Sequence, residues 1–279
     1  MASGKNKKKR KGGKRVQLTA KTADKHDLYE RSVQEVSVDV KFIRRVFKKK
    51  NGRRPHVLRE DFCGTAALCA AWVEKDPENT AFGLDLDAPT LAYGTERHIQ
   101  PLGDEAASRV RLYERDVLEG ANERADVCVA FNFSFCVFKD RPTLVRYYRK
   151  VLEGLKEGGA FMLDLHGGPE AQIEVEEETD HGEFTYVWDQ RAMDALSAEA
   201  IRHIHFRFHD GSEMRKAFTY DWRVWTLPEM RDMLIEAGFS SVDVYWEGSD
   251  KHGEGNGVFR KVARAENEDS WIAYIVAWV

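Results

Sequence analysis

A polar N-terminal stretch is followed by a helical pattern of apolar residues. Between Asp24 and Lys50, apolar side chains recur three or four positions apart, and they include Val36, Val40, Ile43 and Phe47. That spacing places them on one face of an α-helix. Asn51-Gly52 follows at once and is typical of a helix C-terminus. The pattern predicts one amphipathic helix over residues 24–50.

Strand and helix patterns then alternate as far as Gly168. Short apolar runs predict five strands, at HVLREDF, TAFGLDL, RVRLYERDV, ADVCVAFNF and AFMLDLHGG. The intervening helical patterns are TAALCAAWVEK, APTLAYGTERHI and RPTLVRYYRKVLEGLK, the last of which is expected to end at Glu157-Gly158-Gly159. Strands separated by helices indicate crossover connections and a parallel sheet.

The pattern changes between residues 167 and 226. Long aromatic segments with a period of two surround the Asp210-Gly211 turn, which indicates antiparallel hairpins. A helix is predicted at TLPEMRDMLIEAGF, with Thr226 as its N-cap and Gly238 at its end. Two final strands follow, SVDVYWE and WIAYIVAWV. The fold class is therefore α/β: a doubly wound sheet of about seven strands with helices on both faces, an antiparallel last strand, and a β-hairpin insertion (167–226) after the fifth strand.

The charge is distributed unevenly. Residues 5–15 hold eight of the 43 basic residues and no acidic one, so the rest of the chain has a net charge of −12. A net negative charge outside the N-terminal run is a poor match for a surface that binds the phosphates of nucleic acid. We therefore expect residues 1–23 to be a disordered basic tail and residues 24–279 to form one domain. The run KKKRK leaves two alternatives for the tail, a nuclear-localisation patch and a nucleic-acid tether.

Cysteine usage and hydropathy bear on the compartment. The four cysteines form no CxxC pair and lie among apolar residues, which predicts reduced, buried thiols. No apolar run is long enough to span a bilayer, and the basic N-terminus lacks the apolar core of a secretory leader. These features predict a cytoplasmic protein without a membrane partner, or a nuclear one if the basic run directs import in a eukaryote.

Carboxylates stand at the ends of three predicted strands. Glu60 precedes the small-residue turn Cys63-Gly64-Thr65, Asp85 ends the second strand, and Asp116 ends the third. The carboxyl ends of parallel strands share one edge of a sheet, where ligands of open α/β folds bind. Asp85 follows Glu60 by 25 residues, close to the spacing expected of a carboxylate that holds ribose hydroxyls. Asp87, with Pro89 behind it, is the better N-cap for the next helix, which leaves Asp85 for a ligand.

These pieces together resemble the Rossmann-like (class I) S-adenosylmethionine-dependent methyltransferases. VLREDFCGTA is similar to the family's first motif, GLDLD to its ribose-binding motif, RDV to its adenine-binding strand end, and ADVCVAFNF to the strand below the methyl donor. The resemblance covers roughly residues 26–279 and implies S-adenosylmethionine as cofactor. It also implies an N-terminal segment, here with Tyr29, that closes over the donor. The cofactor-binding residues that it implies are Tyr29, Glu60, Phe62, Cys63, Gly64, Asp85, Leu86, Asp116, Val117, Phe131 and Asn132.

Two residues depart from the family pattern. The turn usually has glycine at the positions of Phe62 and Ala66. The departures leave open a relative that binds the donor without catalysis. A nicotinamide dehydrogenase is less favoured because G-x-G-x-x-G is absent.

Acceptor residues are expected beyond the fifth strand. Candidates for catalysis or acceptor binding are His166, Tyr220, Arg223 and Trp225. In FTYDWRVW, alternate residues face opposite sides of a strand, and we expect the side with Asp221, Arg223 and Trp225 to face the acceptor. The insertion aromatics fit either a cage for an apolar or cationic acceptor or the core of the hairpin layer.

The insertion also contains three histidines. The alternation of His203, His205 and His209, without a carboxylate partner at an obvious spacing, predicts exposed strand residues and no metal site.

The sequence thus predicts a methyltransferase that acts on a small-molecule acceptor by in-line displacement. An RNA or protein methyltransferase that recruits its substrate through the basic tail is the alternative, and a non-catalytic S-adenosylmethionine-binding relative is the third.

Overall fold

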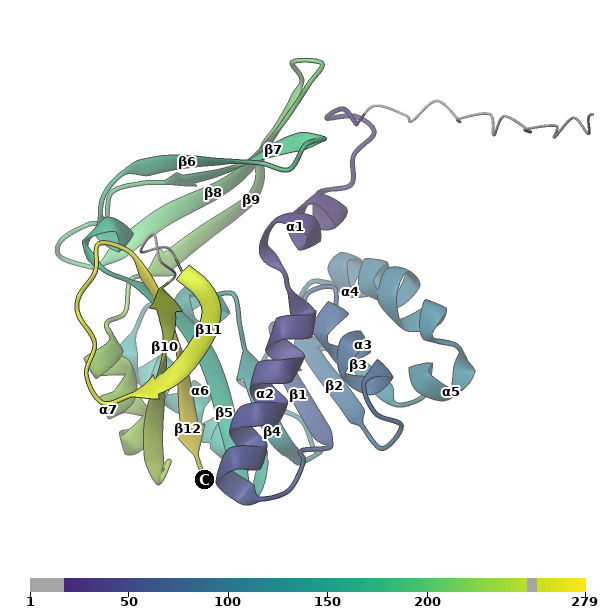
Figure 1. Cartoon of the computed structure of the whole chain (residues 1–279), viewed down its shortest axis with the longest axis vertical. Helices are drawn as coiled ribbons and strands as arrows, with labels where there is room; N and C mark the ends of the chain where they lie inside the picture. Colours follow the sequence, from purple (N-terminus) through teal and green to yellow (C-terminus); the bar gives the residue numbers. More distant parts are fainter. Residues whose placement is uncertain (1–17, 250–254) are drawn as a thin grey trace, which may run out of the picture.

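The computed structural model describes residues 18–249 and 255–279 (Figure 1). Its main sheet has eight strands in the order β11-β10-β12-β5-β4-β1-β2-β3. The parallel part comprises β1 (Val57–Asp61), β2 (Thr80–Asp85), β3 (Val110–Glu114), β4 (Ala125–Ala130) and β5 (Leu155–Gly167). The antiparallel part comprises β10 (Ser241–Ser249), β11 (Gly255–Val262) and β12 (Trp271–Trp278). The predicted doubly wound α/β sheet with an antiparallel last strand is confirmed, and β11 is one strand more than the seven expected.

Helices cover both faces of this sheet. Apolar side chains of α2 (Val36–Asn51) and α3 (Ala67–Glu74) form one buried cluster with one face of the central strands. Those of α6 (Arg141–Glu153) and α7 (Leu227–Ala237) form another on the opposite face. On the first of these faces, α4 (Ala88–Gly94) adds the buried Leu91 to the cluster, and the short α5 (Asp104–Ala107) precedes β3. Within the described residues, no helix is long and apolar enough to cross a membrane.

Four further strands form a separate antiparallel sheet in the insertion. They are β6 (Val175–Asp180), β7 (Phe184–Gln190), β8 (Glu199–Phe208) and β9 (Glu213–Arg223), in sequential order. Figure 1 shows this insertion sheet above the edge of the main sheet where β5 ends, with α1 (Lys25–Val33) between the two parts. The Asp210-Gly211 turn joins β8 to β9, as predicted, and Gly211 takes a left-handed φ of 81°.

Some element boundaries differ from the sequence expectation. The first helix is interrupted at Gln34 and Glu35, where the backbone is non-helical, so α1 and α2 are separate. The helix after β4 ends at Gly154, and the predicted stop at Glu157-Gly158-Gly159 lies inside β5. The predicted caps at Asp87 and Thr226, and the helix end at Gly238, are confirmed.

Part of the expected tail contacts the insertion sheet. Residues 1–17 of that tail lie outside the described part of the chain. Leu18, Ala20 and Ala23 pack against a buried cluster of Leu28 and insertion-sheet aromatics, and the Ala20 N–H donates to Ser212 Oγ at 2.9 Å. These contacts attach residues just before Asp24 to the insertion sheet.

Candidate functional site

Three residues of the turn after β1 take a backbone conformation that favours glycine, although only one of them is glycine. Phe62, Gly64 and Ala66 all have left-handed φ angles, of 56°, 52° and 56°. Phe62 and Ala66 are the two positions where the resembling family usually has glycine. A left-handed non-glycine residue costs roughly 1–2 kcal/mol and persists where the surroundings enforce it. Both departures thus take the left-handed conformation that favours glycine.

Asp85 ties this turn to the end of β2. Its Oδ2 accepts the Gly64 N–H at 2.8 Å, and its Oδ1 accepts the Asp87 N–H at 2.9 Å. Asp87 caps α4 by accepting the Thr90 N–H. Asp85 is therefore free of the capping role and holds the small-residue turn beside the second strand.

A cavity of about 270 Å³, here called the turn cavity, opens at this place. Its lining includes the candidates Tyr29, Glu60, Phe62, Cys63, Gly64, Asp85, Phe131 and Asn132. Glu60 Oε2 accepts the Cys69 N–H at 3.1 Å, and burial raises the pKa of Glu60 to about 8. The structure thus brings eight of the eleven candidate cofactor residues to one cavity.

The other three candidates lie outside that lining. The Leu86 side chain is 68% exposed, and Val117 is buried in the core. Asp116 Oδ1 accepts the Leu118 N–H at 2.9 Å, the turn role that its position in the sequence also allowed.

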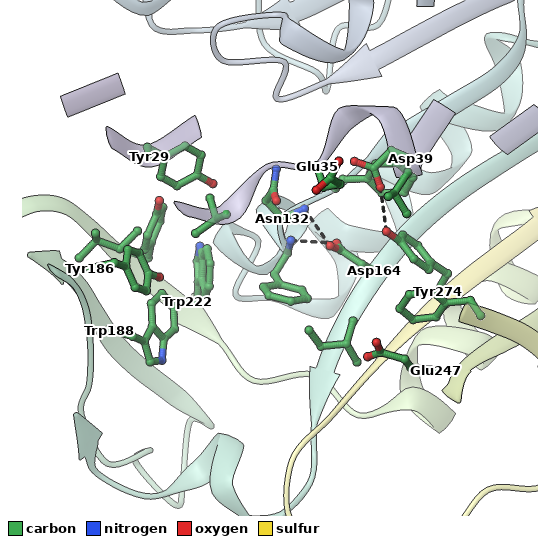
Figure 2. A pocket seen from close by; sticks show the side chains of 18 residues that line it. Tyr29, Glu35, Asp39, Asn132, Asp164, Tyr186, Trp188, Trp222, Glu247 and Tyr274 are labelled. Carbon is green, nitrogen blue, oxygen red and sulfur yellow. Dashed lines mark hydrogen bonds between the residues drawn. The ribbon is translucent and has the colours of Figure 1, made fainter. Parts of the chain in front are cut away.

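A second cavity of about 400 Å³, the insertion cavity, lies between the main sheet and the insertion sheet. Eighteen described residues line it: nine are aromatic, four are acidic, and none of the eighteen is Lys, Arg or His. We call Tyr29, Tyr186, Trp188, Tyr220 and Trp222 the aromatic wall. We call Glu35, Asp39, Asp164 and Glu247 the acidic wall. Figure 2 shows the labelled aromatic side chains on one side of the cavity and the four carboxylates, with Tyr274, on the other.

Asp164 holds an unusual loop beside both cavities. Asn132 and Phe133 have left-handed φ angles of 57° and 56°, and their N–H groups donate to Asp164 at 3.0 and 2.9 Å (Figure 2). Asp164 is 8% exposed, and this burial raises its pKa to about 7. Burial likewise raises the pKa of Asp39, which accepts the Tyr274 hydroxyl at 2.8 Å, to about 6.

The two cavities share part of their lining. Tyr29, Phe131, Asn132 and Tyr220 line both. A ligand in the turn cavity and another in the insertion cavity would therefore meet at these four residues.

Arg223 and Trp225 occupy a different position from the one expected. Arg223 lies 3.9 Å over the Trp225 ring, donates to the Lys139 carbonyl at 3.1 Å and is 3.6 Å from Glu229. Trp225 is buried, and its indole N–H donates to the Phe138 carbonyl. The side of β9 that lines the insertion cavity carries Tyr220 and Trp222, whereas the set expected to face the acceptor, with Arg223 and Trp225, lies outside this lining.

His166 lies with Arg223 and Trp225 around a small void of about 30 Å³. Its Nε2 is 3.0 Å from Ser270 Oγ, and burial lowers its pKa to about 4. Of the four acceptor candidates, only Tyr220 lines the insertion cavity.

The prediction of exposed histidines holds for one residue of three. His203 and His205 are 7% and 3% exposed, whereas His209 is exposed. The expectation for the first two is wrong because they lie on the insertion sheet with partners: His205 Nε2 is 3.2 Å from Asp189, and His203 Nδ1 is 3.0 Å from Thr219 Oγ1. Across the described ranges, no group of three or more His, Cys, Asp or Glu residues is arranged to hold a metal ion.

The acidic wall was not found from the sequence. Its members come from the α1–α2 junction, α2, β5 and β10, which lie far apart along the chain. Two sequence signals could have pointed to it: Asp164 lies within the apolar run AFMLDL, and Asp39 lies near the apolar stripe of its helix.

Comparison with known proteins bears on the fold. No protein-family model and no curated protein sequence matches the chain. Among solved structures, an S-adenosylmethionine-dependent methyltransferase from Clostridium acetobutylicum is similar with a TM-score of 0.65 at 18% identity, over 90% of this chain and 96% of that one. The sugar N-methyltransferase KedS8 from Streptoalloteichus has a TM-score of 0.62 at 16% identity, over 100% and 98%. CalS10, an amino pentose methyltransferase from Micromonospora echinaspora, has a TM-score of 0.64 at 12% identity, over 96% and 100%.

Proposed function

This chain has the Rossmann-like fold of class I S-adenosylmethionine-dependent methyltransferases, and from that premise we propose that it transfers a methyl group from S-adenosylmethionine to a small molecule. The observation that carries the proposal is the lining shared by the two cavities. Methyl transfer requires two ligands that meet end to end at one point, and a pair of joined cavities meets that requirement.

The residues of the turn cavity fit S-adenosylmethionine. A Cβ placed on Gly64 would meet only Thr90 Cγ2, at 3.9 Å, so the turn backbone is open to a ligand. Asp85 and Glu60 provide carboxyl oxygens that can accept hydrogen bonds from hydroxyl and ammonium groups. Asp85 would hold the ribose, and Glu60 would hold the amino-acid portion. Tyr29 would close over the bound donor. When bound, S-adenosylmethionine supplies a methyl group made reactive by a sulfonium.

The insertion cavity favours a small acceptor. The insertion sheet, α1 and the main sheet surround it, and the body of the chain has a net charge of −12. KedS8 and CalS10 are described as sugar methyltransferases. The chain's contribution to in-line transfer would be alignment of the acceptor at Asn132 and Tyr220 and exclusion of water by the aromatic wall.

Donor binding tests this proposal through Asp85. We expect S-adenosylmethionine to bind the full chain in calorimetry, and Asp85→Ala to weaken binding about 10–100-fold, because a charge-assisted hydrogen bond contributes roughly 1.5–3 kcal/mol. Glu114→Ala is the matched control, since Glu114 pairs with Asp85 across β2 and β3 but is exposed and outside the cavity lining. Absence of binding by the wild-type chain, or equal losses in the two variants, would refute the donor assignment.

A further inference from the structure

We propose that the acceptor is an aliphatic amine, cationic in water and free of carboxylate or phosphate groups, whose nitrogen is methylated beside Asp164. The inference rests on the proposed function and specifies its substrate class.

The insertion cavity is negatively charged. Its four carboxylates have no Lys, Arg or His among the described lining residues. None of the four forms an ion pair with a side chain in residues 18–249 or 255–279. A carboxylate or phosphate in this cavity would meet no cation from these residues and would be repelled, whereas an ammonium would supply the missing charge.

The donor does not need these four carboxylates. The turn cavity has its own acidic residues, among them Glu60 and Asp85. The four residues common to both cavities are Tyr29, Phe131, Asn132 and Tyr220, none of which is charged. The acidic wall thus belongs to the acceptor side alone.

The aromatic wall, opposite these carboxylates, also favours a cation (Figure 2). Tyr220 and Trp222 stack with their ring centroids 4.5 Å apart, and Trp188 lies 6.4 Å from each. The negative faces of such rings attract a cation or the C–H groups next to it. Trp222 is 6% exposed, and its indole N–H has no hydrogen-bond partner in the described part of the chain. That unused donor suits a hydroxyl or ether oxygen on the amine.

Asp164 is the carboxylate placed to receive the proton. It accepts hydrogen bonds from the backbone N–H groups of Asn132 and Phe133. Asn132 belongs to the lining that both cavities share. The bound ammonium passes one proton to Asp164, and its nitrogen then holds a free lone pair. This pair forms the N–C bond to the methyl carbon while the C–S bond breaks and its electrons remain on sulfur. The methylated ammonium leaves with the positive charge, and Asp164 releases its proton to water.

The experiment compares three probes of nearly equal shape: cyclohexylamine, cyclohexanol and cyclohexanecarboxylate. Tryptophan fluorescence of the full chain reports binding to the aromatic wall without requiring turnover. We expect the amine to bind at least tenfold more tightly than the other two, and labelled donor to give N-methylcyclohexylamine. Equal binding of the three probes, tighter binding of the carboxylate, or binding of none would overturn the proposal.

Substitutions of single carboxylates test which residues cause the preference for the amine. Asp164→Asn should remove the preference for the amine over the alcohol and leave S-adenosylmethionine affinity within about twofold. Asp39→Asn is the second variant, in case the loop at Asn132 does not fold without Asp164. Asp221→Asn is the control, because Asp221 lies on the outer side of β9, 2.6 Å from Lys139. An amine preference that survives both wall variants would refute the site. Because S-adenosylmethionine binding is measured separately, failure of the donor assignment and failure of the amine assignment give different results.

Discussion

Four non-glycine residues with a left-handed backbone follow the two strands that end at the cavities. Phe62 and Ala66 come after β1, and Asn132 and Phe133 come after β4. Each conformation costs energy, and such strain collects where a loop must present its N–H groups or side chains in a fixed direction. For Asn132 and Phe133, the compensation is visible in their hydrogen bonds to Asp164.

The buried Glu60 should make stability depend on pH. Burial raises its folded-state pKa from 4.5 to about 8. Between these values, the folded chain binds a proton that the unfolded chain does not, so the free energy of unfolding falls as pH rises from about 4.5 to about 8. Glu60→Gln has no such titration and should gain roughly 1–3 kcal/mol relative to wild type between pH 5 and pH 9. Urea unfolding across this range measures the difference.

Wild type and Glu60→Gln both contain the buried acids Asp39 and Asp164. The contributions of these two residues to the pH dependence therefore cancel in the difference between the two proteins. A difference in stability that stays constant from pH 5 to pH 9 would show that Glu60 keeps an ordinary pKa.

At the scale of elements, β9 shows what alternation determines and what it leaves open. The sequence predicted two sets of side chains on opposite faces, and the strand has them. Which face meets the cavity depends on α1 and on the loop after β4, because Tyr29 contacts Phe218 and Phe133 contacts Trp222. These contacts come from distant parts of the chain, and no local pattern contains that information.

Arg223→Ala should therefore reduce stability and not acceptor affinity. The side chain packs on Trp225 and donates to the Lys139 carbonyl, so its loss should lower the free energy of unfolding by about 1–2 kcal/mol. Thermal unfolding measures the loss of stability, and titration with an acceptor measures the acceptor affinity. A large rise in acceptor KM with unchanged stability would restore Arg223 to the acceptor site.

The same distinction holds for the other elements. The order of strands and helices, the caps at Asp87 and Thr226 and the position of Asp85 follow from local patterns, and the structure has them. The interruption at Gln34 and Glu35 does not, because both residues are compatible with a helix. The acidic wall does not follow from local patterns either, because its four residues come from four separate segments of the chain.

At the scale of the whole molecule, α1 connects the main sheet to the insertion sheet. Leu28 is buried against Phe184, Phe206 and neighbouring aromatics of the insertion. On its other side, Glu30 accepts the Thr65 hydroxyl at 2.6 Å and lies 2.7 Å from His98 Nε2. The helix that carries Tyr29 is therefore attached to both parts at once.

Glu30→Ala should loosen this cover over the turn cavity. We expect S-adenosylmethionine to dissociate several-fold faster, with a smaller change in its association rate, as measured by stopped-flow fluorescence. Arg31→Ala is the matched control: its pair with Glu183 is about one-third exposed at both side chains, and exposed pairs contribute little. Equal dissociation rates in the two variants would show that the Thr65 and His98 contacts do not retain the donor.

The position of β12 has a consequence for how the protein is made. This strand lies between β5 and β10, although its residues, Trp271–Trp278, are the last segment of the sheet to be synthesised. Until it leaves the ribosome, β5 has an open apolar edge, and the β10–β11 hairpin has no sheet to join. The nascent chain therefore carries exposed strand edges from the synthesis of β5 until β12 emerges, a state that favours aggregation and chaperone binding. A message truncated before the codon for Trp271 would yield a chain whose two halves of the sheet never meet.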